Sequence, residues 1–141
     1  MTHRPLLVAA VLAVLAPGTA LRADGNHAKG ATPLHISQGR PVMLADYLVP
    51  GKTTIFDFYS EYCPDCRAVA PQLEKLHATR DDVAVVEVDI NRPGIKKIDW
   101  KSPVAAQYGL RSIPYFKIFS PDGKLELEGD GADPKVLARL K

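Results

Sequence analysis

Cys63 and Cys66 stand where a strand pattern gives way to a helix pattern, and this junction constrains the fold of the 141-residue chain most strongly. Residues 53–59 (TTIFDFY) are rich in β-branched and aromatic side chains, which predicts a buried central strand. Pro64 suits the first position of a helix, and apolar residues recur at helical spacing until about residue 80. Both sulfurs are therefore expected within the first turn of a helix that follows a central strand.

Strands and helices continue to alternate along the rest of the chain. Pro71 lies inside the helical pattern and predicts a kink there. A weakly patterned stretch at 34–48 predicts a short strand and one helical turn. The other expected elements are strands at 83–90, 115–119 and 124–128, a hairpin turn at 120–123, and helices at 104–108 and 134–140. This order predicts an α/β fold in which a mixed sheet carries helices on both faces.

The first 23 residues are predicted to be a signal peptide. An apolar run at 6–16 has the length of a signal-peptide core and is too short to cross a bilayer comfortably. Residues 24–33 are polar and predict a flexible leader, and 34–141 then form one domain. An uncleaved anchor or a buried N-terminal helix is the alternative. Export would place the domain in the periplasm or another extracytoplasmic compartment.

Charge and cysteine content exclude several classes of function. The formal net charge is +2, and the positive residues are scattered. Partners such as nucleic acid or an anionic membrane are therefore not expected. The chain has only two cysteines, so they cannot form a disulfide framework that joins distant segments.

The spacing of the cysteine pair indicates thiol–disulfide chemistry. A thiolate at a helix N-terminus is stabilised by unpaired backbone N–H groups and by the helix dipole. Cys63 is expected to be the more exposed cysteine and the nucleophile, whereas Cys66, one turn later, resolves the mixed disulfide. Asp65 suits the helix start but opposes a neighbouring thiolate.

Two other interpretations of the pair remain open, a zinc site and an inert structural disulfide. A structural zinc ion needs four ligands, and the sequence has no second cysteine pair. His77 lies three turns down the helix and is expected on the helix surface. No metal ion or organic cofactor is therefore predicted.

The segment at 56–66 (FDFYSEYCPDC) resembles the active-site segment of the thioredoxin family, and three further features match in order. Asp57 lies six residues before the first cysteine, like the buried acid of the family, and Pro71 lies five residues after the second, like its helix-kinking proline. Ile113 and Pro114 precede a strand, like the cis-proline loop. The resemblance extends over residues 53–141 and implies a thioredoxin-like fold.

The resemblance also implies roles for individual residues. Asp57 would lie beneath the cysteines with a raised pKa and exchange a proton with Cys66; a carboxylate satisfied by a hydrogen bond or a lysine is the alternative. Pro114, in cis, would face the cysteines and exclude metal ions. The backbone of Ile113 would pair with an extended substrate. The substrate surface would also include Tyr62, Pro64 and Asp65.

The sequence departs from common thioredoxins at three places. The residues between the cysteines are Pro-Asp where common thioredoxins have Gly-Pro, which leaves the direction of electron transfer open. Glu87 falls where many thioredoxins have a lysine, so it would form a coupled carboxyl pair with Asp57. The connection at 91–103 is longer than in minimal thioredoxins, and its Trp100 either covers the sheet or contacts a partner.

The predicted function is a monomeric thiol–disulfide oxidoreductase that acts as a reductase or isomerase on protein disulfides of exported proteins. Ile113 before the expected cis-proline resembles the reducing members of the family, which favours the reductive direction. Because a reductase outside the cytoplasm needs an electron donor, a membrane thiol-transfer protein is the expected partner. A thiol oxidase is the alternative within this class. A non-catalytic thioredoxin-like module that binds extended peptides is the alternative from another class.

Overall fold

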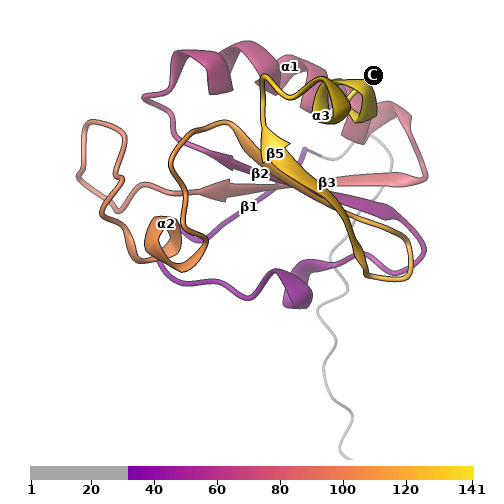
Figure 1. Ribbon diagram of the computed structural model, residues 1–141, viewed down its shortest axis with the longest axis horizontal. Helices are drawn as coiled ribbons and strands as arrows, with labels where there is room; N and C mark the ends of the chain where they lie inside the picture. Colours follow the sequence, from indigo (N-terminus) through magenta and orange to yellow (C-terminus); the bar gives the residue numbers. More distant parts are fainter. Residues whose placement is uncertain (1–31) are drawn as a thin grey trace, which may run out of the picture.

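The computed structural model describes residues 32–141 (Figure 1). The predicted signal peptide and residues 24–31 of the predicted leader lie outside this range, and the proposed division of the chain at these points stays a prediction. None of the helices within the described residues is long and apolar enough to cross a membrane.

A five-stranded mixed sheet forms the centre of the domain, in the order β1-β3-β2-β4-β5. β3 pairs in parallel with both β1 and β2, whereas β4 pairs antiparallel with β2 and β5. The strands are β1 (Leu34–Ile36), β2 (Thr53–Tyr59), β3 (Val83–Asp89), β4 (Tyr115–Phe119) and β5 (Leu125–Asp130). Because β2 is the central strand, the cysteine pair that follows its C-terminal end lies near the middle of the sheet.

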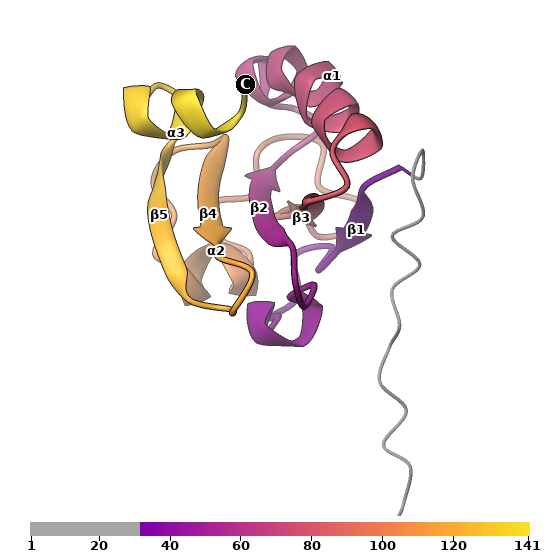
Figure 2. The same ribbon diagram turned by 90° about the vertical axis from the view of Figure 1, so that its right-hand side faces the viewer.

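Helices cover both faces of this sheet, as predicted. Figure 2 shows α1 and α3 on one face and α2 with the 3₁₀ helix η1 on the other. The helices are η1 (Leu44–Tyr47), α1 (Pro64–Thr79), α2 (Pro103–Gln107) and α3 (Pro134–Arg139). A proline occupies the first turn of all three α-helices, where a missing N–H costs nothing. Side chains of Ser102 and Asp133 cap α2 and α3 by accepting hydrogen bonds from backbone N–H groups.

The alternation of side chains along β2 divides the core into two clusters. Phe56 and Phe58 are fully buried on the face of α2 and η1, together with Val86, Val88 and Val104. Ile55 is buried on the face of α1 and α3, together with Leu73, Val85, Phe116, Ile118 and Val136. Because successive side chains of a strand point to opposite faces, Asp57 shares the α1 face with Ile55. One carboxyl group is thus placed inside an otherwise apolar layer.

The secondary structure differs from the sequence prediction mainly at element ends, by one or two residues. The predicted position of His77 on the helix surface was wrong, because the residue is buried (7% exposed). Its Nδ1 accepts a hydrogen bond from the backbone N–H of Val85 at 3.0 Å. The reason is helical spacing, because His77 lies four residues after the buried Leu73 and so faces the sheet.

Candidate active site

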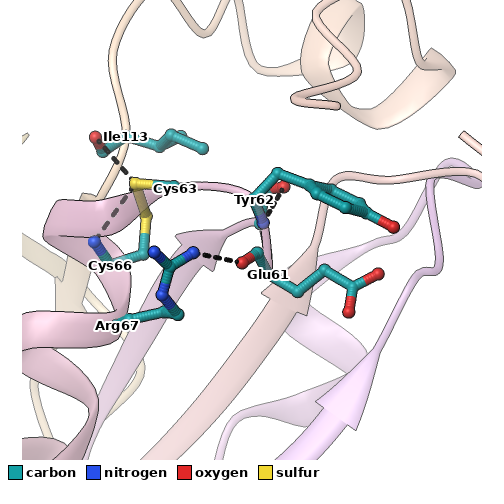
Figure 3. Close-up of a disulfide and its surroundings, with 7 residues drawn as sticks. Glu61, Tyr62, Cys63, Cys66, Arg67 and Ile113 are labelled. Atoms are coloured by element: carbon teal, nitrogen blue, oxygen red, sulfur yellow. Dashed lines mark hydrogen bonds between the residues drawn. A yellow bond between two sulfur atoms is a disulfide. The ribbon is translucent and has the colours of Figure 1, made fainter. Parts of the chain in front are cut away.

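Cys63 and Cys66 are joined by a disulfide at the junction of β2 and α1 (Figure 3). Cys63 has an extended backbone and is the N-cap of α1, while Cys66 lies in the first turn, with the two Cα atoms 5.3 Å apart. The backbone N–H of Cys66 donates to Sγ of Cys63 at 3.1 Å. A sulfur at this position receives an otherwise unpaired helix donor, which favours negative charge on Cys63 after reduction.

The loop before the disulfide is held by local hydrogen bonds. The N–H of Cys63 donates to the carbonyl of Ser60 at 3.0 Å, and the N–H of Tyr62 donates to Ser60 Oγ at 3.2 Å. Arg67 donates from Nη1 to the carbonyl of Glu61 at 2.7 Å (Figure 3). These contacts fix the N-cap sulfur relative to the helix.

The prediction that Cys63 would be the more exposed cysteine was wrong for this disulfide state. Both cysteines are only 3% exposed. Sγ of Cys63 lies 3.6 Å from the carbonyl oxygen of Ile113, because the loop before β4 crosses the helix start (Figure 3). In the reduced protein this carbonyl can accept a hydrogen bond from the Cys63 thiol.

The peptide bond between Ile113 and Pro114 is cis, as the resemblance implied. Pro114 is buried, and Ile113 is partly buried against the α2-side cluster. The carbonyl of Pro114 accepts a hydrogen bond from the N–H of Gly131 at 2.9 Å. This bond joins the loop at 113–114, whose Ile113 carbonyl lies at the disulfide, to the loop that contains Gly131.

Asp57 is 2% exposed, and its Oδ1 has no hydrogen-bond partner among the described residues. Burial raises the pKa of Asp57 well above its usual range, and the charge of Glu87 raises it further. The described part of the chain places no lysine in an ion pair with Asp57, contrary to the alternative in which a lysine satisfies it. Both causes favour the protonated form of this buried carboxyl group.

The sequence analysis did not single out His35 as part of the site. β1 sets His35 in register with Glu87, and Glu87 in register with Asp57. Nδ1 of His35 lies 3.0 Å from Oε2 of Glu87 and 3.0 Å from the hydroxyl of Tyr59. The sequence predicted a short strand within 34–48, but a strand of three residues has no periodicity from which its pairing with β3 could be recognised.

A groove of about 520 Å³ lies beside the disulfide, between α1 and the loops at 112–114 and 130–132. Of the predicted substrate-contacting residues, Asp65 and Ile113 line it together with Pro114. Tyr62 lines a separate hollow of about 250 Å³, beside Glu61 and Arg92 among others. The predicted substrate surface is therefore divided between two hollows that share no lining residue. Pro64 lines neither hollow and is exposed at the helix start.

Trp100 is 42% exposed and belongs to neither core cluster. Its loop is ordered by Asn91, whose side-chain amide donates to the carbonyls of Ile95 and Lys97 at 3.0 and 2.7 Å.

Within residues 32–141, no three His, Cys, Asp or Glu side chains are grouped as metal ligands would be.

Known proteins match the chain in both sequence and fold. The thioredoxin family model matches residues 44–140. Thioredoxin-1 of Schizosaccharomyces pombe is 32% identical over 91 residues, which cover 64% of this chain and 80% of that protein. A thioredoxin variant from Halobacterium salinarum has a TM-score of 0.57 and 26% identity, with 80% of this chain and 90% of that chain covered.

A further match supports the fold alone. Thioredoxin f2, in a complex with ferredoxin:thioredoxin reductase, has a TM-score of 0.53 and 23% identity, with 77% of this chain and 90% of that chain covered. The matched residues 44–140 contain the disulfide, the buried acid and the cis-proline loop. The chain belongs to the thioredoxin family and is a thiol–disulfide oxidoreductase that works through a redox-active cysteine pair without a further cofactor.

Proposed function

We propose that this protein reduces or isomerises disulfides of exported proteins, with Cys63 as the nucleophile and Cys66 as the resolving cysteine. The observation that carries the proposal is the disulfide between the N-cap sulfur and the first helical turn, beside the Ile113 carbonyl. Cys63 comes first because its sulfur receives the helix N–H and lies 3.6 Å from the carbonyl oxygen of Ile113, a residue that lines the groove.

In the reduced protein, the Cys63 thiolate attacks one sulfur of the substrate disulfide and forms a mixed disulfide, while the other substrate sulfur leaves as a thiolate. The Cys66 thiol then loses its proton to the Asp57 carboxylate, directly or through water, as its sulfur attacks Cys63. The second substrate sulfur leaves, and the bond between Cys63 and Cys66 forms. The protein loses two electrons, and the substrate becomes a dithiol.

The substrate segment would lie in the groove beside the disulfide. Its extended backbone would approach the loop at Ile113 and Pro114, and Asp65 would border it at the helix start. Tyr62 would contact a second part of the substrate in the neighbouring hollow, and the exposed Pro64 would contact it at the helix start.

The location and the electron donor are parts of the same proposal. The apolar segment at 6–16 supports export, and a reductase outside the cytoplasm needs a donor such as a membrane thiol-transfer protein. Thioredoxin f2 provides a parallel, since its structure was solved in a complex with a reductase. Isoleucine at position 113, as in reducing relatives, supports the reductive direction.

The test is the reduction potential of the Cys63–Cys66 pair, measured by equilibrating the protein against glutathione and dithiothreitol buffers. A value near about −270 mV, the region of thioredoxin, is expected for a reductase. A value near about −120 mV would make the protein a thiol oxidase. No reversible transition between dithiol and disulfide would leave a non-catalytic binding module.

A further inference from the structure

A row of three titratable side chains crosses the sheet beneath the active-site helix. His35 on β1 is in register with Glu87 on β3, and Glu87 is in register with Asp57 on β2. Register partners on neighbouring parallel strands lie about 4.8 Å apart and point to the same face of the sheet. The row therefore begins at the edge strand β1 and ends at Asp57 on β2, the strand that the cysteine pair follows.

Exposure rises steadily along this row. Asp57 is 2% exposed, the side chain of Glu87 is 8% exposed, and that of His35 is 58% exposed. The imidazole nitrogen Nδ1 of His35 is 3.0 Å from Oε2 of Glu87. Of the two neighbouring carboxyl groups, only Glu87 has an ion-pairing partner in the described structure, whereas Oδ1 of Asp57 has no hydrogen-bond partner there.

Two adjacent carboxyl groups in an apolar interior do not ionise together at low cost, so one of them keeps a proton. A protonated imidazole at His35 would stabilise the anion on Glu87, and this anion would in turn oppose ionisation of Asp57. The pKa of Glu87 is raised overall by burial, although the charge of His35 lowers it, and both burial and the charge of Glu87 raise the pKa of Asp57 well above its usual range.

The other groups around the pair do not reverse this order. Glu74 on α1 raises the pKa of Glu87 by repulsion, and it ranks after His35 among the causes. The hydroxyl of Tyr59 lies 3.0 Å from Nδ1 of His35, and burial with nearby carboxylates raises its pKa, so it stays uncharged. On β4, the register partner of Asp57 is the apolar Phe116.

We propose that Glu87 and His35 are positioning residues that keep the shared proton of the carboxyl pair on Asp57. This proposal rests on the proposed function in one respect, because it is there that Asp57 exchanges this proton with Cys66. A protonated Asp57 can return its proton to the Cys66 thiolate when the disulfide is reduced.

The test is a carbon-13 NMR titration of the side-chain carboxyls of Asp57 and Glu87 in the oxidised full chain. In Glu87→Gln, the titration of Asp57 is expected to shift to lower pH, because the opposing charge is gone. In His35→Gln, the titration of Glu87 is expected to shift to higher pH, and that of Asp57 to lower pH. Glu126→Gln on β5, which removes a carboxylate paired with Arg139, is the control and should shift neither.

Glu87→Asp retains the charge and should keep the titration of Asp57 near that of the wild type, which separates charge from packing. His35 is exposed, so His35→Gln should fold even if Glu87→Gln does not. An unchanged titration of Asp57 in Glu87→Gln, or of Glu87 in His35→Gln, overturns the proposal. The titrations need no substrate, so this failure is distinct from a failure of the proposed reductase activity, which the wild-type potential tests separately.

Discussion

Gly131 and Pro114 are in close contact at the active site, because a Cβ atom on Gly131 would lie 2.7 Å from Cγ of Pro114. The N–H of Gly131 also donates to the carbonyl of Pro114 at 2.9 Å. The proline ring is rigid and buried, so it cannot move aside as the end of a flexible side chain would. The absence of a side chain at 131 therefore allows the loop at 113–114 to lie against the disulfide.

Gly131→Ala is accordingly expected to displace Pro114 and its loop. The expected cost is about 1–3 kcal/mol in the free energy of unfolding, the usual range for overpacking, together with slower reduction of substrate disulfides. Urea unfolding and a turnover assay measure the two effects. Lys135→Ala, at an exposed position of α3 that does not line the groove, is the control. Equal stability and turnover in Gly131→Ala would show that the loop adapts freely.

The raised pKa of Asp57 predicts a pH-dependent stability. In the unfolded chain the pKa of an aspartate is about 3.9. Because the folded pKa of Asp57 is higher, its favourable contribution to the free energy of unfolding is fully present below that pH and is lost as the pH rises through the folded pKa. Asp57→Asn avoids this loss and should be more stable than wild type at alkaline pH, by about 1–3 kcal/mol, with little difference near pH 4. Urea unfolding of the oxidised proteins at several pH values measures this difference.

Asp46→Asn, at an exposed acid of η1, is the control for this experiment. It should follow the wild-type pH dependence. A gain in Asp57→Asn that is the same at all pH values would contradict the linkage, since a packing effect does not depend on protonation.

The order of the two cysteines can be tested by trapping. Cys66→Ala should accumulate mixed disulfides with substrate proteins through Cys63, because nothing resolves them, and its turnover should fall to background. Cys63→Ala should trap far less, since Cys66 lies one turn inside the helix. Non-reducing electrophoresis of each variant after incubation with oxidised substrate measures the adducts. The reverse pattern would assign the attack to Cys66, and no adducts with either variant would favour a binding module.

His77 is expected to matter for stability and not for catalysis. His77→Leu removes the acceptor of the Val85 N–H, and an unsatisfied buried donor costs about 1–3 kcal/mol. The reduction potential should stay that of the wild type. Lys75→Leu, at an exposed position of α1, controls for helix propensity and added apolar surface and should cost much less. Thermal unfolding of both variants is the measurement.

The local part of the site could be predicted from the sequence. The bounds of β2 and β4, the proline start of α1 and the position of the cysteines at the strand–helix junction all follow from periodicity and from the conformational limits of proline. These features depend on residues within a few positions of one another. The buried acid and the cis-proline came from the resemblance to a family, since neither is visible in composition or spacing.

The sequence by itself determined which elements form and where the sulfurs lie along the chain. Only the tertiary structure decided that the Ile113 carbonyl lies at Cys63 and that His35 reaches Glu87 across β1 and β3. These contacts join residues far apart in sequence. The physical reason is that strand register and helix packing are set by burial of the whole core, and no local pattern contains that information.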